Sequence, residues 1–113
     1  MWWPTGTVKD HLWIVISDPS HNGGRIVVIN LTESSHGSRS FTLVPGQHRY
    51  IYKDSDVNFG DAFETSVTVL QGEIACNSAR PHDPMDAAIV SKIISECKTH
   101  PAFHPILRKL LPA

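Results

Sequence analysis

Two nearly unbroken apolar runs dominate the first third of the chain, at residues 11–17 and 25–32. Both are rich in β-branched residues, and the segment between them contains Pro, Asn and Gly, so the pattern predicts a pair of antiparallel strands. Because neither run alternates with polar residues, we expect both strands to lie at the centre of a small β-core. The polar residues at the ends of these runs are His11, Ser17 and Thr32. Loops can place residues at such positions next to a substrate.

Shorter patterns on either side of this hairpin predict further strands and loops. A Ser-rich polar stretch at residues 33–40 predicts a loop, and residues 5–10 predict a second loop that leads into the first strand. Residues 1–4 (Met-Trp-Trp-Pro) suit a short edge strand or a partner interface. Further strands are expected at residues 41–44, 48–53, 57–63 and 64–70, with turns at Pro45-Gly46 and Gln71-Gly72.

The last third of the chain changes to helical periodicity. Apolar residues recur at helical spacing within residues 85–97, and residues 105–111 could add one or two turns with Pro at the first position. Together these elements predict a mainly β fold with a C-terminal helix (α+β). We expect one domain over residues 1–113, a small SH3-like, partly open barrel of five or six antiparallel strands capped by a helix.

The composition of the chain excludes only a few classes of function. The 113 residues carry a net charge of −1, which argues against nucleic-acid binding driven by charge alone. Two cysteines do not form a disulfide framework, so two reduced thiols are expected, with Cys76 and Cys97 both buried. No apolar run approaches a membrane span and no signal sequence is recognised, so we expect a cytoplasmic protein without a membrane partner.

The order of these parts resembles the PemK/MazF toxin superfamily, in a divergent branch. The resemblance rests on short motifs: an apolar strand that ends in Ser, a next strand that ends in Thr, an "S-x-V…D-x-x-x-T" stretch, a Gly turn before a C-terminal helix, and a "P-G-x-H" segment. In this chain the two strands are residues 11–17 and 25–32, and the stretch runs from Asp54-Ser-Asp-Val57 to residues 61–65. The turn is Gln71-Gly72, followed by the helix at 85–97, and the last segment is residues 45–48.

The resemblance implies a cytoplasmic homodimer that cleaves single-stranded RNA without a metal or other cofactor and is occluded by an antitoxin protein. Two departures from the superfamily pattern argue against nuclease activity in this chain. Glu64 occupies the position that resembles the superfamily's arginine, and the usual opening strand is shortened to Met1–Pro4.

Metal-free RNA cleavage needs a base for the 2′-hydroxyl, an acid for the leaving oxygen and a cation beside the phosphate. The sequence offers His11 and His48 as base and acid, with Lys9 or Arg49 as the cation. Ser17, Thr32 and Arg49 are candidates to bind the substrate.

Each candidate also has an ordinary structural explanation. A strand-end histidine commonly bonds a backbone carbonyl, a histidine after Pro-Gly can stabilise the turn, and surface Lys and Arg are commonly just solvated. No zinc site is expected, because Pro101 and Pro105 argue against one helix presenting His100 and His104. The alternative function is a non-catalytic SH3-like interaction domain, or a degenerate toxin homologue, that binds a protein through Trp2, Trp3 and the 33–40 loop.

Overall fold

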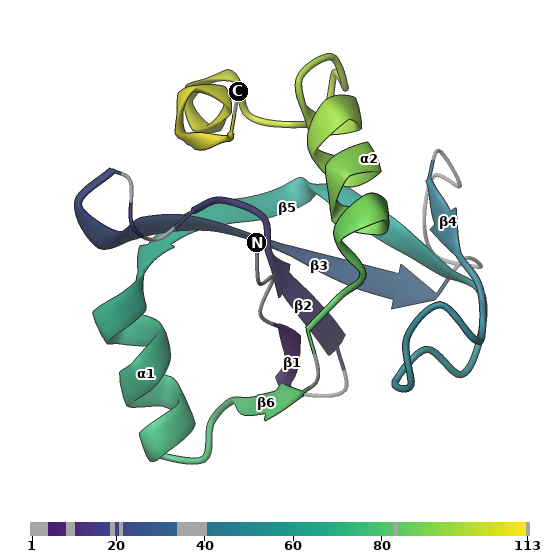
Figure 1. Ribbon diagram of the computed structural model, residues 1–113, viewed down its shortest axis with the longest axis horizontal. Helices are drawn as coiled ribbons and strands as arrows, with labels where there is room; N and C mark the ends of the chain where they lie inside the picture. Colours follow the sequence, from purple (N-terminus) through teal and green to yellow (C-terminus); the bar gives the residue numbers. More distant parts are fainter. Residues whose placement is uncertain are drawn as a thin grey trace.

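The computed structural model describes residues 5–8, 11–18, 20, 22–33, 41–82 and 84–112. Within these residues the chain forms one six-stranded antiparallel sheet with the order β4-β5-β3-β2-β1-β6, which curls into a half-barrel (Figure 1). The strands are β1 Thr5–Val8, β2 His11–Val15, β3 Arg25–Glu33, β4 Thr42–Leu43, β5 Ser55–Ser66 and β6 Arg80–His82. The helices are α1 Val67–Ala75 and α2 Ala87–Cys97, with 3₁₀ turns η1 Asn22–Gly24 and η2 Pro105–Leu110.

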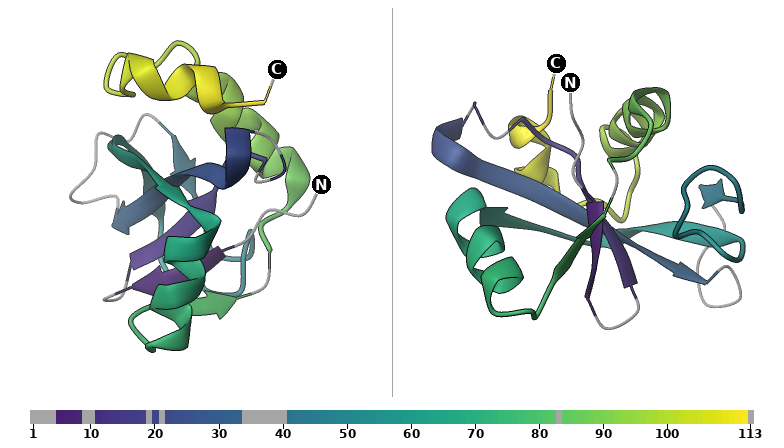
Figure 2. Two further views of the ribbon diagram at one scale, coloured as in Figure 1. Left: turned by 90° about the vertical axis from the view of Figure 1, so that its left-hand side faces the viewer. Right: turned by 60° about the horizontal axis from the view of Figure 1, so that its bottom comes forward.

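Both faces of the central strands are buried, which explains their continuous apolar sequence. Alternate residues of β2 and β3 point to opposite faces. On one face Ile14 and Ile29 join a core that includes Val90 and Ile93 of α2. The other face packs against Val67, Leu70 and Ile74 of α1. The buried residues of this second cluster are Trp13, Val15, Ile26 and Val28 of the two strands, and Ala79 from the segment between α1 and β6. Figure 2 shows α1 and α2 on opposite sides of the sheet.

The C-terminal helical segments begin and end at recognisable local signals. The carboxylate of Asp86 caps α2 by accepting a hydrogen bond from the Ala88 amide at 2.8 Å. Nδ1 of His104 similarly accepts from the Ile106 amide at the start of η2, where Pro105 occupies the first position. The Arg108 guanidinium then donates to the carbonyls of Cys97 and His100, which ties η2 to the end of α2.

The mainly β fold, the central hairpin and the C-terminal helix are confirmed, while several local predictions are wrong. The expected strand at 64–70 stops at Ser66, whose hydroxyl caps α1 by accepting from the Val69 amide, and the expected Gly72 turn lies inside that helix. Residues 48–53 form turns instead of a strand, since the Ile51 amide donates back to the His48 carbonyl. Residues 5–8 are a strand rather than a loop.

Some predictions concern residues that the structure does not describe, and one concerns a membrane-spanning segment. The proposed interface at Trp2 and Trp3, and residues 34–40 of the Ser-rich loop, lie outside the described residues. Glu33, expected to open that loop, ends β3 instead. Among the described residues no helix is both long enough and apolar enough to cross a membrane.

The two cysteines lie in opposite environments, so the prediction that both are buried is half wrong. Cys97 belongs to the core, and burial, followed by the nearby Glu96 carboxylate, raises the pKa of its thiol to about 12. Cys76 is exposed just after α1, and both thiols are free.

We therefore expect a thiol reagent such as DTNB at pH 8 to modify one cysteine per native chain and two per unfolded chain. The thiolate is the reactive form, and a buried thiol with a raised pKa supplies almost none of it. Absorbance of the released thiolate, with and without guanidinium, measures the stoichiometry. Rapid reaction of both thiols in the native protein, or loss of the fast reaction in C97S rather than in C76S, would contradict the placement.

Candidate functional site

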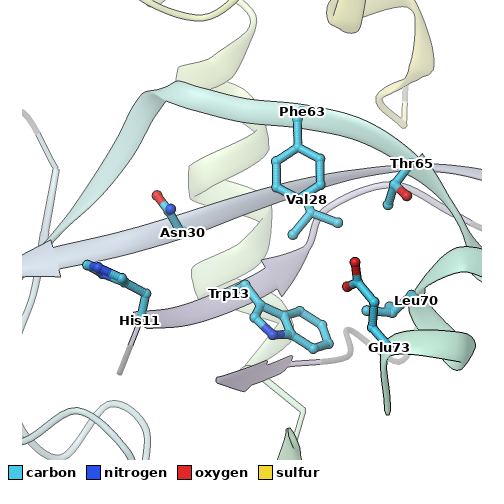
Figure 3. A pocket seen from close by; sticks show the side chains of 8 residues that line it. All are labelled: His11, Trp13, Val28, Asn30, Phe63, Thr65, Leu70 and Glu73. Atoms are coloured by element: carbon cyan, nitrogen blue, oxygen red, sulfur yellow. The ribbon is translucent and has the colours of Figure 1, made fainter. Parts of the chain in front are cut away.

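A cavity of about 310 Å³ lies on the face of the sheet that α1 covers (Figure 3). Strands β2, β3 and β5 and helix α1 supply its walls. Its lining residues are His11, Trp13, Val28, Asn30, Phe63, Thr65, Leu70 and Glu73. Their mixture of aromatic and apolar walls with a few polar groups is typical of small-ligand sites, whose volumes start at about 300 Å³.

The position of Trp13 in this cavity depends on a glycine in the neighbouring strand. Gly6 of β1 is paired directly with Trp13, and the indole lies against its Cα. A Cβ atom at Gly6 would lie 2.3 Å from Cζ2 of Trp13 and 2.4 Å from the carbonyl oxygen of Arg80. Only glycine leaves room for the indole here.

A shift in strand register shapes the opposite wall. Asn30 pairs with Asn58, but Val28 pairs with Phe63, so part of β5 leaves the ladder between these two pairs. The shift brings Phe63 and Thr65 onto the cavity side. Because α1 follows β5 without a connecting loop, it places Leu70 and Glu73 over the same space.

Two buried polar atoms beside this cavity have no hydrogen-bond partner among the described residues. They are Nε1 of Trp13 and Oδ1 of Asn30. Buried polar atoms are almost always paired in folded proteins, so each unpaired atom calls for an explanation such as a water or a ligand. Asn30 is also the one polar residue within the apolar run of β3, on the same strand face as Ile26 and Val28.

His11 stands exposed at one end of the cavity, at the start of β2. Its Nδ1 lies 3.3 Å from the carbonyl oxygen of Leu31. A carbonyl oxygen can only accept, so the hydrogen of the neutral ring is on Nδ1, which leaves Nε2 as the basic nitrogen. The expected bond from a strand-end histidine to a backbone carbonyl is therefore present, and in the neutral ring it leaves Nε2 as the nitrogen without a hydrogen.

Thr32 is the predicted site residue that the sheet brings next to His11. Trp13 pairs with Asn30, and the same register extended by two residues sets His11 beside Thr32. Thr32 in turn pairs with Asp56 of β5, a buried carboxylate that accepts a 2.6 Å hydrogen bond from the Thr42 hydroxyl. A row of polar residues thus crosses four strands at this end of the sheet.

His48 and Arg49 are not part of this cavity. His48 is buried, and its Nδ1 accepts a hydrogen bond from the Tyr50 amide at 3.2 Å. The Tyr50 ring stacks on His82 of β6 with ring centres 3.6 Å apart, and the Arg49 guanidinium lies 5.5 Å from the centre of the Tyr50 ring. These residues connect the loop before β5 to the far edge of the sheet. Lys9 lies outside the described residues.

Ser17 has a role within the fold. It is 1% exposed, and its hydroxyl accepts a 2.8 Å hydrogen bond from the amide of Val27, which prolongs the β2–β3 pairing beyond the end of β2. A phosphate could reach this hydroxyl only if the strand end opened.

S17A should therefore lower the free energy of unfolding by about 1–3 kcal/mol, because the Val27 amide would stay buried without an acceptor. Urea unfolding followed by circular dichroism measures the loss, with the exposed Ser91→Ala of α2 as a control near zero. Unchanged stability in S17A would contradict the structural role.

Glu64 makes an ion pair where the superfamily pattern has an arginine. Nε of Arg25 donates to Oε2 of Glu64 at 2.6 Å between β3 and β5, with both side chains partly exposed. Neither residue lines the cavity. A cation for a phosphate is therefore not supplied from position 64.

The sequence pointed to only part of this site. His11 and Thr32 were recognisable at the ends of apolar runs, and Asn30 could have been noticed as the polar interruption of one of them. Glu73 could not, because its segment was expected to follow a turn rather than lie in a helix. No group of three or more His, Cys, Asp or Glu within the described ranges could hold a metal ion.

Comparisons with known proteins give no further guide to this site. No family model, no curated protein and no solved structure matches the chain. The chemistry of the cavity is therefore the basis on which a function can be proposed.

Proposed function

We propose that this chain is a PemK/MazF-like toxin, with an SH3-like barrel capped by its C-terminal helix, that cleaves single-stranded RNA without a metal ion. The observation that supports this most is the placement of His11. Its Nδ1–H faces the Leu31 carbonyl, its basic Nε2 is left for chemistry, and it stands at the end of a cavity with aromatic walls.

In the proposed reaction Nε2 of His11 takes the proton of a ribose 2′-hydroxyl. The resulting oxygen attacks the adjacent phosphorus, the bond to the 5′-oxygen breaks, and that oxygen takes a proton from water. The hydroxide that is left takes the proton from Nε2 of His11, which restores the base. The products are a 2′,3′-cyclic phosphate and a 5′-hydroxyl. The Thr32 hydroxyl donates to a phosphate oxygen. The sequence offers Lys9, two residues before His11 and outside the described residues, as the candidate for the positive charge.

The rest of the proposal follows from the resemblance to the superfamily. The toxin acts as a homodimer in the cytoplasm, and an antitoxin protein blocks it. His48 and Arg49 have no part in the proton transfer, because they belong to the cluster around Tyr50 and His82.

Expression in bacterial cells tests this function. Induction of the wild-type chain should stop growth and fragment cellular RNA, whereas H11A should accumulate without either effect. Normal growth and intact RNA, with the wild-type protein folded and abundant in the cells, would contradict the proposal.

The Arg25–Glu64 ion pair favours a second candidate, a non-catalytic interaction domain. Glu64 stands where the superfamily pattern has an arginine, and it is paired with Arg25. Phe63 of the cavity wall and Val69 of α1 are each 51% exposed, and a protein partner could cover these apolar side chains. This alternative predicts that a partner protein binds wild type and H11A equally and that RNA stays intact.

A further inference from the structure

We propose that the cavity between α1 and the sheet binds a guanine base of the RNA, and that the Glu73 carboxylate recognises it. This inference rests on the proposed function and names the base that the site selects. It combines three features of the cavity: its two aromatic walls, the charge of its polar groups and the unpaired oxygen of Asn30.

The walls suit a flat ring. Figure 3 shows the Phe63 ring and the Trp13 indole on opposite sides of Val28, which lies between them in this view, with the Glu73 side chain reaching toward them from α1. Unpaired RNA bases are commonly held by stacking on aromatic side chains. The volume of about 310 Å³ is sufficient for a base, and it is at the small end for larger cofactors.

The charge of the lining selects a base rather than a phosphate. None of the described lining residues is Lys or Arg, and Glu73 adds a carboxylate. A phosphate would be repelled here. A ligand that presents N–H groups at one end would instead satisfy Glu73, and a donor at its other end would give Oδ1 of Asn30 the partner that it lacks within the described structure.

Guanine meets this requirement best among the four bases. Its N1–H and N2 amino group are adjacent donors on one edge, which a carboxylate can accept as a pair. Adenine and cytosine present an amino group beside an acceptor nitrogen, which the carboxylate would repel. Uracil presents one N–H between two carbonyl oxygens.

The shape of the cavity also fixes where a bound base would lie relative to His11, the proposed general base. Figure 3 places His11 and Glu73 at opposite ends of it. A guanine whose Watson–Crick edge faces Glu73 would therefore direct its ribose and phosphate toward His11. Cleavage is then expected beside a guanosine.

The test uses short fluorescently labelled oligonucleotides in which every nucleotide carries a 2′-O-methyl group, with uridine throughout except for a central guanosine, inosine or adenosine. The 2′-O-methyl group prevents cleavage, and inosine lacks only the N2 amino group of guanosine. Fluorescence anisotropy with the full chain should show guanosine binding about tenfold or more tightly than inosine or adenosine. E73Q should lose this preference, while E64Q, the same change on an exposed carboxylate outside the cavity, should keep it.

The E73Q change is not expected to unfold the protein, because Glu73 is exposed and its backbone carbonyl, which accepts from Ser78 and Ala79, is unaltered. Equal binding of the three oligonucleotides, binding of none, or a guanosine preference that survives in E73Q would each overturn the inference. If His11-dependent RNA cleavage persists in that case, only the guanine site fails. If cleavage is absent as well, the proposed function fails with it.

Discussion

Replacing His11 with alanine should slow RNA cleavage by about 10²- to 10⁴-fold, the range that a positioned general base contributes. Nε2 is the nitrogen left without a hydrogen when Nδ1 faces the Leu31 carbonyl, so H11A removes the proton acceptor. Because His11 is exposed, its removal costs the fold little beyond this one hydrogen bond.

Initial cleavage rates of a labelled single-stranded RNA measure the loss, and added imidazole should restore part of the H11A rate. H104A serves as the matched control, since His104 caps η2 and does not line the cavity. Equal rates for H11A and wild type would rule out His11 as the base. Loss of rate with no rescue by imidazole and a lowered unfolding temperature would assign His11 a structural role instead.

Replacing Gly6 with alanine should lower the free energy of unfolding by at least about 1–3 kcal/mol. The new Cβ would overlap the Trp13 indole and the backbone carbonyl of Arg80, and a backbone atom cannot turn aside as a flexible side chain can. Since Trp13 forms one wall of the cavity, the same change should weaken binding of the guanosine oligonucleotide.

Gly72 offers the opposite case within the same chain. It lies inside α1, and apart from its chain neighbours and the helix's own backbone no described atom lies within 4 Å of the place that a Cβ would take. Alanine is about 1 kcal/mol better than glycine within a helix. Urea unfolding should therefore show G6A destabilised and G72A slightly stabilised. A G6A protein as stable as wild type would contradict the close packing of β1 on Trp13, and a destabilised G72A would contradict α1.

The central hairpin and α2 could be predicted because their local signals agree with their tertiary roles. The β-branched runs of β2 and β3 are buried on both faces, and α2 has a capping Asp86 and an apolar stripe that packs on the core. Helix α1 could not be predicted in the same way. Val67 and Val69 alternate with polar residues as in a strand, and the helix is favoured by the Ser66 cap and by packing of Leu70 and Ile74 on the sheet.

The contrast between local signals and tertiary packing also explains which site residues could be predicted from the sequence. His11 and Thr32 mark the ends of strands whose register is set by apolar pairs such as Ile14 with Ile29. His48 seemed equivalent by sequence, but its loop folds back so that Tyr50 stacks on His82, and this contact spans distant parts of the chain. Long-range contacts of this kind leave no local pattern.

The central claim is metal-free RNA cleavage, and its most direct test is to incubate the purified wild-type chain with end-labelled single-stranded RNA in excess EDTA. We predict that cleavage continues and that the products carry 2′,3′-cyclic phosphate and 5′-hydroxyl ends. Intact RNA, or cleavage that stops on chelation, would contradict the claim and favour the interaction domain or a metal-dependent activity instead.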